Sequence, residues 1–320
     1  MSVLFSPTCN RNDWKKRQKL LKKVRTFFEE RSILEVETPS LSRACGTDPH
    51  LDFIETLESP PRYLMTSPEF HMKRLLAAGF GDVYQITKSF RHGETGDKHN
   101  SEFSIVEWYR ENWDLEKLMQ ETEALCSLVL EKPIKAKRTR WIDAFKNYAG
   151  VDPFCQNQSC FIETCQKHQV PIPEYHKAFS REDWWDYLMV MVIEAFLGKE
   201  QPEFLTDYPP SQAALAQIHI DQEGYSWGKR FELYIHNIEL CNGYQELTDP
   251  IEQKNRFQKD IQTRQNLEKP IPAIDQNFLD ALHHGLPYCS GVALGLDRLF
   301  MLALHKKQIS SVLLFPDDRA

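Results

Sequence analysis

The sequence predicts an α+β fold in which an antiparallel sheet is flanked by helices. Residues 14–31 place apolar side chains at helical spacing, with Lys and Arg on the opposite face. Residues 83–90 and 102–109 have the pattern of two strands joined by a polar, glycine-containing loop, which indicates an antiparallel hairpin. A second hairpin is expected over 231–241, and residues 290–304 predict a strand that runs directly into a helix.

Shorter elements are expected between these segments. Residues 33–36 predict a short strand. Ser67, Pro68 and Glu69 predict the start of a helix, with Ser67 as the N-cap and Pro68 in the first helical position, because a hydroxyl, a proline and a carboxylate each suit that end of a helix. An amphipathic helix is expected over 114–130.

Length and composition indicate one large domain. The chain has 320 residues, of which 41% are hydrophobic and 27% charged, which is enough for a substantial buried core. We expect a single domain over residues 1–320 with a helical insertion at about 111–228. Residues 141–210 predict partly helical structure without recognisable chemistry.

Charge and cysteine usage narrow the class of protein. The 39 Lys and Arg against 46 Asp and Glu give a formal charge of -7, so no general positive field would hold a polyanion such as tRNA. The eight cysteines lack the spacing of zinc ligands, and we expect reduced thiols. Neither a signal peptide nor a membrane span is apparent, so a cytoplasmic protein is expected.

The first candidate site lies on the second strand of the 83–109 hairpin. Side chains two apart share a face of a strand, so Phe103, Glu107 and Tyr109 should lie together. An aromatic ring, a carboxylate and a phenol on one face suit a ligand with a planar base and a cationic tail. The alternative is that Glu107 simply pairs with Arg110 or with a lysine across the sheet.

The second candidate site is the 231–241 hairpin. A two-residue turn at 236–237 would pair Tyr234 with Glu239 and Glu232 with Cys241, so Glu232 and Glu239 would share a face. Two adjacent carboxylates repel unless a cation lies between them, and Mg²⁺ on ATP phosphates is the obvious candidate. The alternative is a surface pair neutralised by lysines.

Two further features suit a phosphate-bearing ligand. Arg91 and His99 stand at the two ends of the loop in the first hairpin, where a guanidinium can clamp a carboxylate or a phosphate. Residues 291–298 join a glycine-containing strand to a helix start with Arg298, so a base or ribose can approach the main chain closely. The segment matches neither the P-loop nor the dinucleotide-binding fingerprint.

In this order, the pieces resemble the three signature motifs of class II aminoacyl-tRNA synthetases, most closely those of the lysyl enzymes. The resemblance covers roughly residues 10–320 and implies the class II catalytic core, a homodimer formed through the first motif, and the use of ATP and Mg²⁺. Five segments carry it: ILEVETP (33–39), TSPE (66–69), FRHGETGDKHNSEFSIVEWY (90–109), ELCNGYQELTD (239–249) and GVALGLDRL (291–299).

The resemblance also implies roles for individual residues. Arg91, Arg298 and Glu239 would be catalytic, Glu232 and Glu239 would hold Mg²⁺, and Arg91 would clamp the amino-acid carboxylate and the α-phosphate. ATP-binding roles are implied for Arg91, His92, Gly93, Glu94, His99, Asn100, Phe103, Glu239, Leu240, Asn242, Gly295 and Arg298, with Phe103 stacked on adenine. Amino-acid-binding roles are implied for Ser67, Pro68, Glu69, Glu107, Tyr109, Glu246 and Ala293.

Within that set, the resemblance places Glu69 against the α-ammonium of the substrate, and Glu107, Tyr109 and Glu246 around the side-chain ammonium. Two carboxylates and a phenol around one buried amine select a cation such as lysine, because a neutral side chain would leave those groups unpaired.

Three departures from the lysyl pattern change the expected substrate and acceptor. Only about thirty residues precede the first motif, too few for an anticodon-binding domain. Ala293 replaces a glycine of the third motif, and one methyl group in a packed pocket shifts preference by ~1–3 kcal/mol, which indicates an isomer of lysine such as β-lysine. In the second motif the glutamate of Arg-x-Glu stands one residue later, as Glu94.

A lysyl-type core without an anticodon-binding domain resembles the paralogues that activate lysine or (R)-β-lysine with ATP and attach it to a lysine of elongation factor P. The resemblance therefore implies a ligase with a protein acceptor. The alternatives are a truncated synthetase that acylates tRNA, a non-catalytic regulatory paralogue, and an amide synthetase that forms a small product.

Overall fold

The computed structural model describes residues 5–320, which form two compact units. Unit 1 contains the residues up to Pro133 and those from Gln245 onward, and unit 2 contains Ile134–Tyr244. The prediction of one domain with an insertion at about 111–228 is not tested by this division. Unit 2 starts later than the predicted insertion because α3 (Leu115–Leu130) packs on α1 (Arg11–Glu29) within unit 1.

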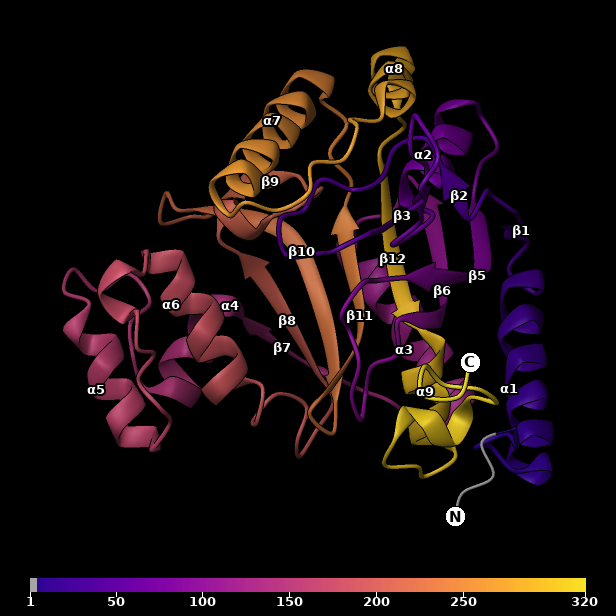
Figure 1. The fold of residues 1–320 in the computed structure, drawn as a ribbon, viewed down its shortest axis with the longest axis horizontal. Helices are drawn as coiled ribbons and strands as arrows, with labels where there is room; N and C mark the ends of the chain where they lie inside the picture. The colour runs from indigo at the N-terminus through magenta and orange to yellow at the C-terminus, as the bar shows by residue number, and fades with distance from the viewer. Residues whose placement is uncertain (1–4) are drawn as a thin grey trace. The chain divides into compact units, whose positions relative to one another are not determined.

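Unit 1 contains the first predicted hairpin. β5 (Val83–Phe90) and β6 (Glu102–Glu111) pair antiparallel, and β12 (Cys289–Gly295) lies antiparallel on the other side of β6. The edge strand β1 (Leu34–Glu35) joins β5 in parallel, so the predicted antiparallel sheet has one parallel pair here (Figure 1). A small antiparallel sheet has the order β2 (Leu41–Ser42), β4 (Tyr63–Leu64) and β3 (Ile54–Glu55).

Side chains alternate between the two faces of β6. Trp108 contacts Phe28 of α1, with ring centroids 5.3 Å apart, and donates a hydrogen bond to Glu121 of α3 at 3.1 Å. Glu107 and Tyr109 point to the opposite face. The strand therefore packs against the helices α1 and α3 on one face and leaves its polar side chains on the other.

The remaining helices of unit 1 include two that the sequence reasoning missed. α7 (Pro250–Asn266) and α8 (Gln276–Gly285) begin at N-cap aspartates, Asp249 and Asp275, which are recognisable signals for a helix start. α8 packs on α2, where the Phe278 and Phe70 rings stack with centroids 4.6 Å apart. The other helices are α2 (Glu69–Ala77), α9 (Leu296–Ala303) and the short 3₁₀ helix η5 (Ile309–Val312).

Unit 2 contains the second predicted hairpin, in which β10 (Ser226–Ile235) and β11 (Ile238–Gln245) are antiparallel. His236 and Asn237 form the predicted turn with φ values of 52° and 58°, as a tight hairpin turn requires. A bulge next to Leu233 and Tyr234 shifts the register, so Glu232 pairs with Asn242 and not with Cys241 as predicted. β8 (Glu203–Tyr208) and β9 (Ile218–Ile220) pair antiparallel with β10, and β7 (Lys137–Arg140) pairs parallel with β8.

The helices of unit 2 surround an aromatic core that includes Trp141, Trp184 and Trp185, which packs against Leu205 and Tyr208 of β8. This confirms the partly helical character predicted for 141–210. The helical segments are α4 (Trp141–Ala144), η1 (Phe145–Ala149), α5 (Ser159–His168), η2 (His176–Ala178), α6 (Arg181–Leu188), η3 (Met189–Ile193) and η4 (Pro210–Gln212).

The cysteines differ in part from the prediction of reduced thiols. Cys155 and Cys160 form a disulfide, so the prediction is wrong for this pair, which brackets the start of α5. The other six cysteines are free and buried. Among residues 5–320, no helix combines the length and the apolar character that crossing a membrane would require.

A buried ion pair fixes α9 in unit 1. Arg17 Nη2 lies 2.6 Å from Asp297 Oδ1, and the two side chains are 7% and 2% exposed. The other Asp297 oxygen accepts a hydrogen bond from the Ser104 backbone N–H on β6 at 2.7 Å. Helices α1 and α9 and strand β6 therefore meet at one charged contact.

We predict that Arg17→Met destabilises the protein by about 3–5 kcal/mol, because it leaves the Asp297 carboxylate buried without its cation. Urea unfolding followed by circular dichroism measures the loss. Lys16→Met is the matched control on the same helix, since the Lys16 side chain is 65% exposed and its removal should change stability by at most about 0.5 kcal/mol. Equal stabilities for the two variants would contradict the prediction.

Candidate active site

The start of α2 positions the first group of site residues. α2 begins at Glu69, with Pro68 as its N-cap residue, so the prediction that Ser67 is the N-cap and Pro68 the first helical residue is wrong by one position. The Pro68 backbone, with ψ near 2°, has not yet entered the helix. Ser67 nevertheless accepts a hydrogen bond from the Glu69 backbone N–H at 3.1 Å, and its hydroxyl donates to Glu107 Oε2 at 2.7 Å.

Strand β6 supplies the second group. Glu107 Oε1 accepts a hydrogen bond from the Tyr109 hydroxyl at 2.7 Å, and both residues are 2% exposed. The alternative pairing of Glu107 with Arg110 is excluded, because Arg110 lies on the other face and forms ion pairs with Asp82 (2.9 Å) and Glu121 (3.5 Å). Glu107 is therefore a buried carboxylate held by two hydroxyl donors.

The third group includes a lysine that sequence reasoning missed. Lys73 lies one turn after Glu69 on α2, and its Nζ is 2.5 Å from Glu69 Oε1 and 2.5 Å from Glu246 Oε2. Lys73 and Glu246 are each 1% exposed. A glutamate followed four residues later by a lysine on a predicted helix was the available signal, but such pairs are usually exposed.

Strand β12 lines this group of side chains with small residues. Gly291 pairs with Tyr109 and Ala293 pairs with Glu107 in the register of β12 and β6. A Cβ atom at Gly291 would lie 2.2 Å from Tyr109 Cε1 and 2.6 Å from Glu246 Oε1, so no side chain fits there. The structure thus brings Ser67, Glu69, Glu107, Tyr109 and Glu246 together in unit 1 around Lys73, in what we call the amine pocket.

Burial sets the electrostatics of the amine pocket. It raises the pKa of Glu107 to about 7, a shift to which the negative charge of Glu69 adds, although the hydrogen bonds from Ser67 and Tyr109 oppose it. Burial likewise raises the pKa of Glu246 to about 8, against the opposing charge of Lys73. The pKa of Tyr109 is also raised by burial and by the Glu107 charge, so its phenol stays neutral. The raised pKa values of Glu107 and Glu246 favour their protonated forms, and a cationic ligand beside them would favour the ionised forms.

The predicted nucleotide residues of unit 1 lie around the β5–β6 loop. The Arg91 guanidinium lies 5.1 Å from the centroid of the Phe103 ring, and its Nη1 is 3.4 Å from Glu94 Oε1. Arg298, in the first turn of α9, donates to His99 Nε2 at 2.6 Å and to the Lys98 carbonyl at 3.2 Å. Loss of solvation and the Arg298 charge lower the pKa of His99, so its ring is neutral and accepts this bond.

The other loop residues differ in how they are used. Asn100 is buried and binds within unit 1, donating to the Glu102 carbonyl at 2.8 Å and accepting from the Asp317 backbone N–H at 3.0 Å. His92 and Gly93 are exposed, and Gly93 has a left-handed φ of 78°. Gly295 precedes α9 as its N-cap residue. The ATP-binding roles of these residues stay predictions.

The predicted Mg²⁺ ligands lie in unit 2. Both Glu232 oxygens already have donors, one in the Arg230 guanidinium and the other in the Tyr234 hydroxyl at 2.8 Å. Glu239 pairs with Tyr234 as predicted and is half-buried. Asn242 accepts from Arg230 at 3.2 Å, and Leu240 is buried.

Glu232 and Glu239 provide too few ligands to hold a metal ion by themselves. Among residues 5–320, no group of three or more His, Cys, Asp and Glu side chains is arranged to hold a metal ion. One or two carboxylates are what Mg²⁺ takes when phosphate oxygens and water complete its coordination. Glu232 and Glu239 therefore suit a metal that arrives with ATP. To bind it, Glu232 would have to release either Arg230 or Tyr234.

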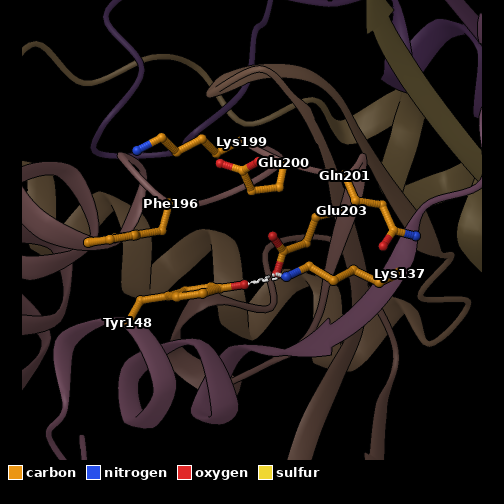
Figure 2. A pocket seen from close by; sticks show the side chains of 7 residues that line it. All are labelled: Lys137, Tyr148, Phe196, Lys199, Glu200, Gln201 and Glu203. Carbon is orange, nitrogen blue, oxygen red and sulfur yellow. Dashed lines mark hydrogen bonds and ion pairs between the residues drawn. The ribbon is translucent and has the colours of Figure 1, made fainter.

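A separate hollow in unit 2 has a volume of about 310 Å³ (Figure 2). Figure 2 shows Lys137 pointing toward the Tyr148 hydroxyl and the Glu203 carboxylate, at 2.5 Å and 3.2 Å. Glu203 is fully buried and also accepts from the Thr139 hydroxyl and the Gly198 backbone N–H. The polar groups beside this hollow thus satisfy one another's hydrogen bonds, as in a structural network.

The fold agrees with the comparisons to known proteins. The chain belongs to the class II tRNA synthetases of the D, K and N group, whose family model matches residues 5–319. Within that family it is similar to proteins named elongation factor P–(R)-β-lysine ligase. The one from Salmonella dublin is 42% identical, covering 100% of this chain and 99% of that protein. Those from Haemophilus influenzae and Hamiltonella defensa are 41% and 40% identical, each covering 99% of this chain and 98% of the relative.

We predict that Gly291→Ala raises the KM for the amino acid on the order of a hundredfold or more, because the new methyl displaces Tyr109 and Glu246. Amino-acid-dependent exchange of pyrophosphate into ATP measures it. Gly46→Ala is the control in the same unit, since its Cβ would meet only Thr66 Oγ1, at 3.8 Å. A normal KM for Gly291→Ala would show that the close packing of Gly291 against Tyr109 and Glu246 is not required for binding of the amino acid.

We also predict that Glu107→Gln stabilises the substrate-free protein at pH 8 but not at pH 5. A carboxyl group whose folded pKa is raised binds more protons in the folded state, so the stability of the unaltered protein falls as pH rises from about 4.5 through 7. Gln mimics the protonated acid and should raise the melting midpoint at pH 8 by roughly 2–8 °C.

Differential scanning calorimetry across this pH range checks the Glu107 prediction. Glu102→Gln on the same strand is the control, because Glu102 is exposed and pairs with Lys88. It should leave the pH dependence unchanged. A Glu107→Gln variant with the same pH dependence as the unaltered protein would mean that Glu107 does not titrate in this range.

Proposed function

We propose that this protein uses ATP to activate (R)-β-lysine or lysine as an aminoacyl adenylate and transfers it to a lysine side chain of elongation factor P. The amine pocket is the observation that carries the proposal. In this pocket Glu107 accepts hydrogen bonds from two hydroxyl groups, and Glu69 and Glu246 share one buried lysine. Three carboxylates so arranged suit a substrate with more than one ammonium group. The names of relatives about 40% identical over nearly the whole chain support the same acceptor.

The reaction needs positioning and charge stabilisation more than covalent chemistry from the protein. A carboxylate oxygen of the amino acid attacks the α-phosphorus of ATP, and the bond to pyrophosphate breaks. The acceptor amine then attacks the carbonyl carbon, loses a proton and releases AMP. Arg91 and Arg298 are the cations of unit 1 proposed to stabilise the charge on the phosphoryl oxygens.

Several finer features belong to this proposal as well. Mg²⁺ would enter with ATP and use Glu239 and Glu232, supplying additional charge stabilisation for the phosphates. Phe103 would stack on adenine once Arg91 has turned to the substrate. We further propose a homodimer formed through the segment 33–39 and a cytoplasmic location.

The decisive experiment is the intact mass of elongation factor P after incubation with the protein, ATP, Mg²⁺ and either isomer. We expect an increase equal to one lysyl residue with at least one isomer. We also expect Arg298→Ala to lower pyrophosphate exchange by roughly 10²- to 10³-fold, while Arg62→Ala, which removes an exposed ion pair with Glu58, leaves it unchanged.

Other outcomes would identify the alternatives. Acylation of tRNA with no change in the mass of elongation factor P would indicate a synthetase. Absence of exchange with both isomers would indicate a non-catalytic paralogue.

A further inference from the structure

Lys73 is a buried cation that the proposed reaction does not use. Its side chain is 1% exposed and forms ion pairs with Glu69 and Glu246. The Lys73 Nζ also lies 5.9 Å from the centroid of the Phe278 ring. Lysine is almost never fully buried unless it is paired. Burial lowers the pKa of Lys73, but the charges of Glu246 and Glu69 outweigh this and raise it above its usual value. Lys73 is therefore a permanent ammonium group within the amine pocket.

The charged groups of the amine pocket come from three segments of unit 1. α2 contributes Glu69 and Lys73, β6 contributes Glu107, and the segment after β11 contributes Glu246. Tyr109 on β6 and Cys289 on β12 are neutral, because burial raises the pKa of each well above its usual value. Three carboxylates and one ammonium leave a formal charge of -2 when every carboxyl group is ionised.

We propose that Lys73 is a specificity-determining residue, a resident ammonium that neutralises one of the three carboxylates and leaves two negative charges for the two ammonium groups of a diamino acid. This rests on the proposed function, in which the substrate carboxylate is the reacting group and is held outside the amine pocket. An amino acid with one ammonium group would leave one buried carboxylate without a cation, which is costly.

Geometry places Lys73 directly beside the carboxylates that are proposed to bind the substrate. Lys73 reaches carboxylates on two separate segments, so it holds Glu69 and Glu246 in place relative to each other. Glu246 Oε1 is buried and has no hydrogen-bond partner among the described residues. It lies against the bare Gly291 backbone position, 2.6 Å from where a Cβ would be. A buried carboxylate oxygen that lacks a donor is a group that a ligand ammonium can satisfy.

The test combines removal of Lys73 with chemical replacement of its ammonium. In Lys73→Ala the missing atoms correspond to n-propylammonium. We expect the KM for (R)-β-lysine or lysine in pyrophosphate exchange to rise roughly 10- to 100-fold, with a smaller change in kcat. Added n-propylammonium should restore the KM, and 1-propanol, which has nearly the same shape without the charge, should not.

A second variant tests the charge independently of space. Lys73→Met keeps the volume of the side chain, and without the ammonium the carboxyl groups should retain their protons to higher pH. The pH at which KM reaches its minimum should therefore rise relative to the unaltered protein. Lys88→Ala is the matched control, because it removes another Lys–Glu ion pair of unit 1 at an exposed position, and its KM and pH profile should not change.

The outcomes separate this proposal from the proposed function. Absence of exchange in the unaltered protein with either isomer overturns the proposed function. Normal exchange with an unchanged KM in Lys73→Ala, or equal rescue by 1-propanol and n-propylammonium, overturns only the role of Lys73. Failure of both Lys73 variants to fold, judged by circular dichroism, would make Lys73 a folding residue and would also overturn its role in specificity.

Discussion

Two buried carboxylates, Glu107 and Glu246, and the partly buried Glu69 beside them are the constraint on which the structure of unit 1 depends. Each buried charge costs several kcal/mol unless a cation or hydrogen-bond donors compensate it. The compensating groups are Lys73, Ser67 and Tyr109. Because they come from α2, the segment before it and β6, the start of α2 has to lie over the middle of β6. The position of the helix and the charge of the pocket are therefore one requirement.

The same strand connects the amine pocket to the hydrophobic core. β6 presents Glu107 to the pocket and its neighbour Trp108 to α1 and α3, so a shift of one residue in register would exchange the buried carboxylate for an indole. α9 is restrained similarly, since Asp297 is held by Arg17 while Arg298 reaches His99. Core packing thus determines where the charged side chains of the site point.

Sequence reasoning recovered what local patterns encode. Alternation predicted that Glu107 and Tyr109 share a face, and the helix–strand patterns predicted α1, β5, β6, β12 and α9 within a few residues. It did not predict the bulge in the second hairpin, because the extra residue, Leu240, resembles any other apolar strand residue. It also missed Lys73, whose importance comes from Glu246, a partner more than 170 positions away. The N-cap aspartates of α7 and α8, Asp249 and Asp275, are sequence signals from which both helices could be predicted.

In the proposed reaction, the charge of the pocket selects the class of substrate and its shape selects the isomer. On that proposal, the number of carboxylates in the amine pocket would distinguish a diamino acid from an amino acid with one amine, because an unpaired buried charge costs about 3–5 kcal/mol. Charge does not distinguish lysine from β-lysine, since both carry two ammonium groups. That choice depends on where the second amine lies, and a methyl group alters preference by only ~1–3 kcal/mol. Ala293 lies opposite Glu107 on β12 and is half-buried. On the proposed function, Lys73 and the three glutamates would define the class of substrate, and Ala293 would select the isomer within that class.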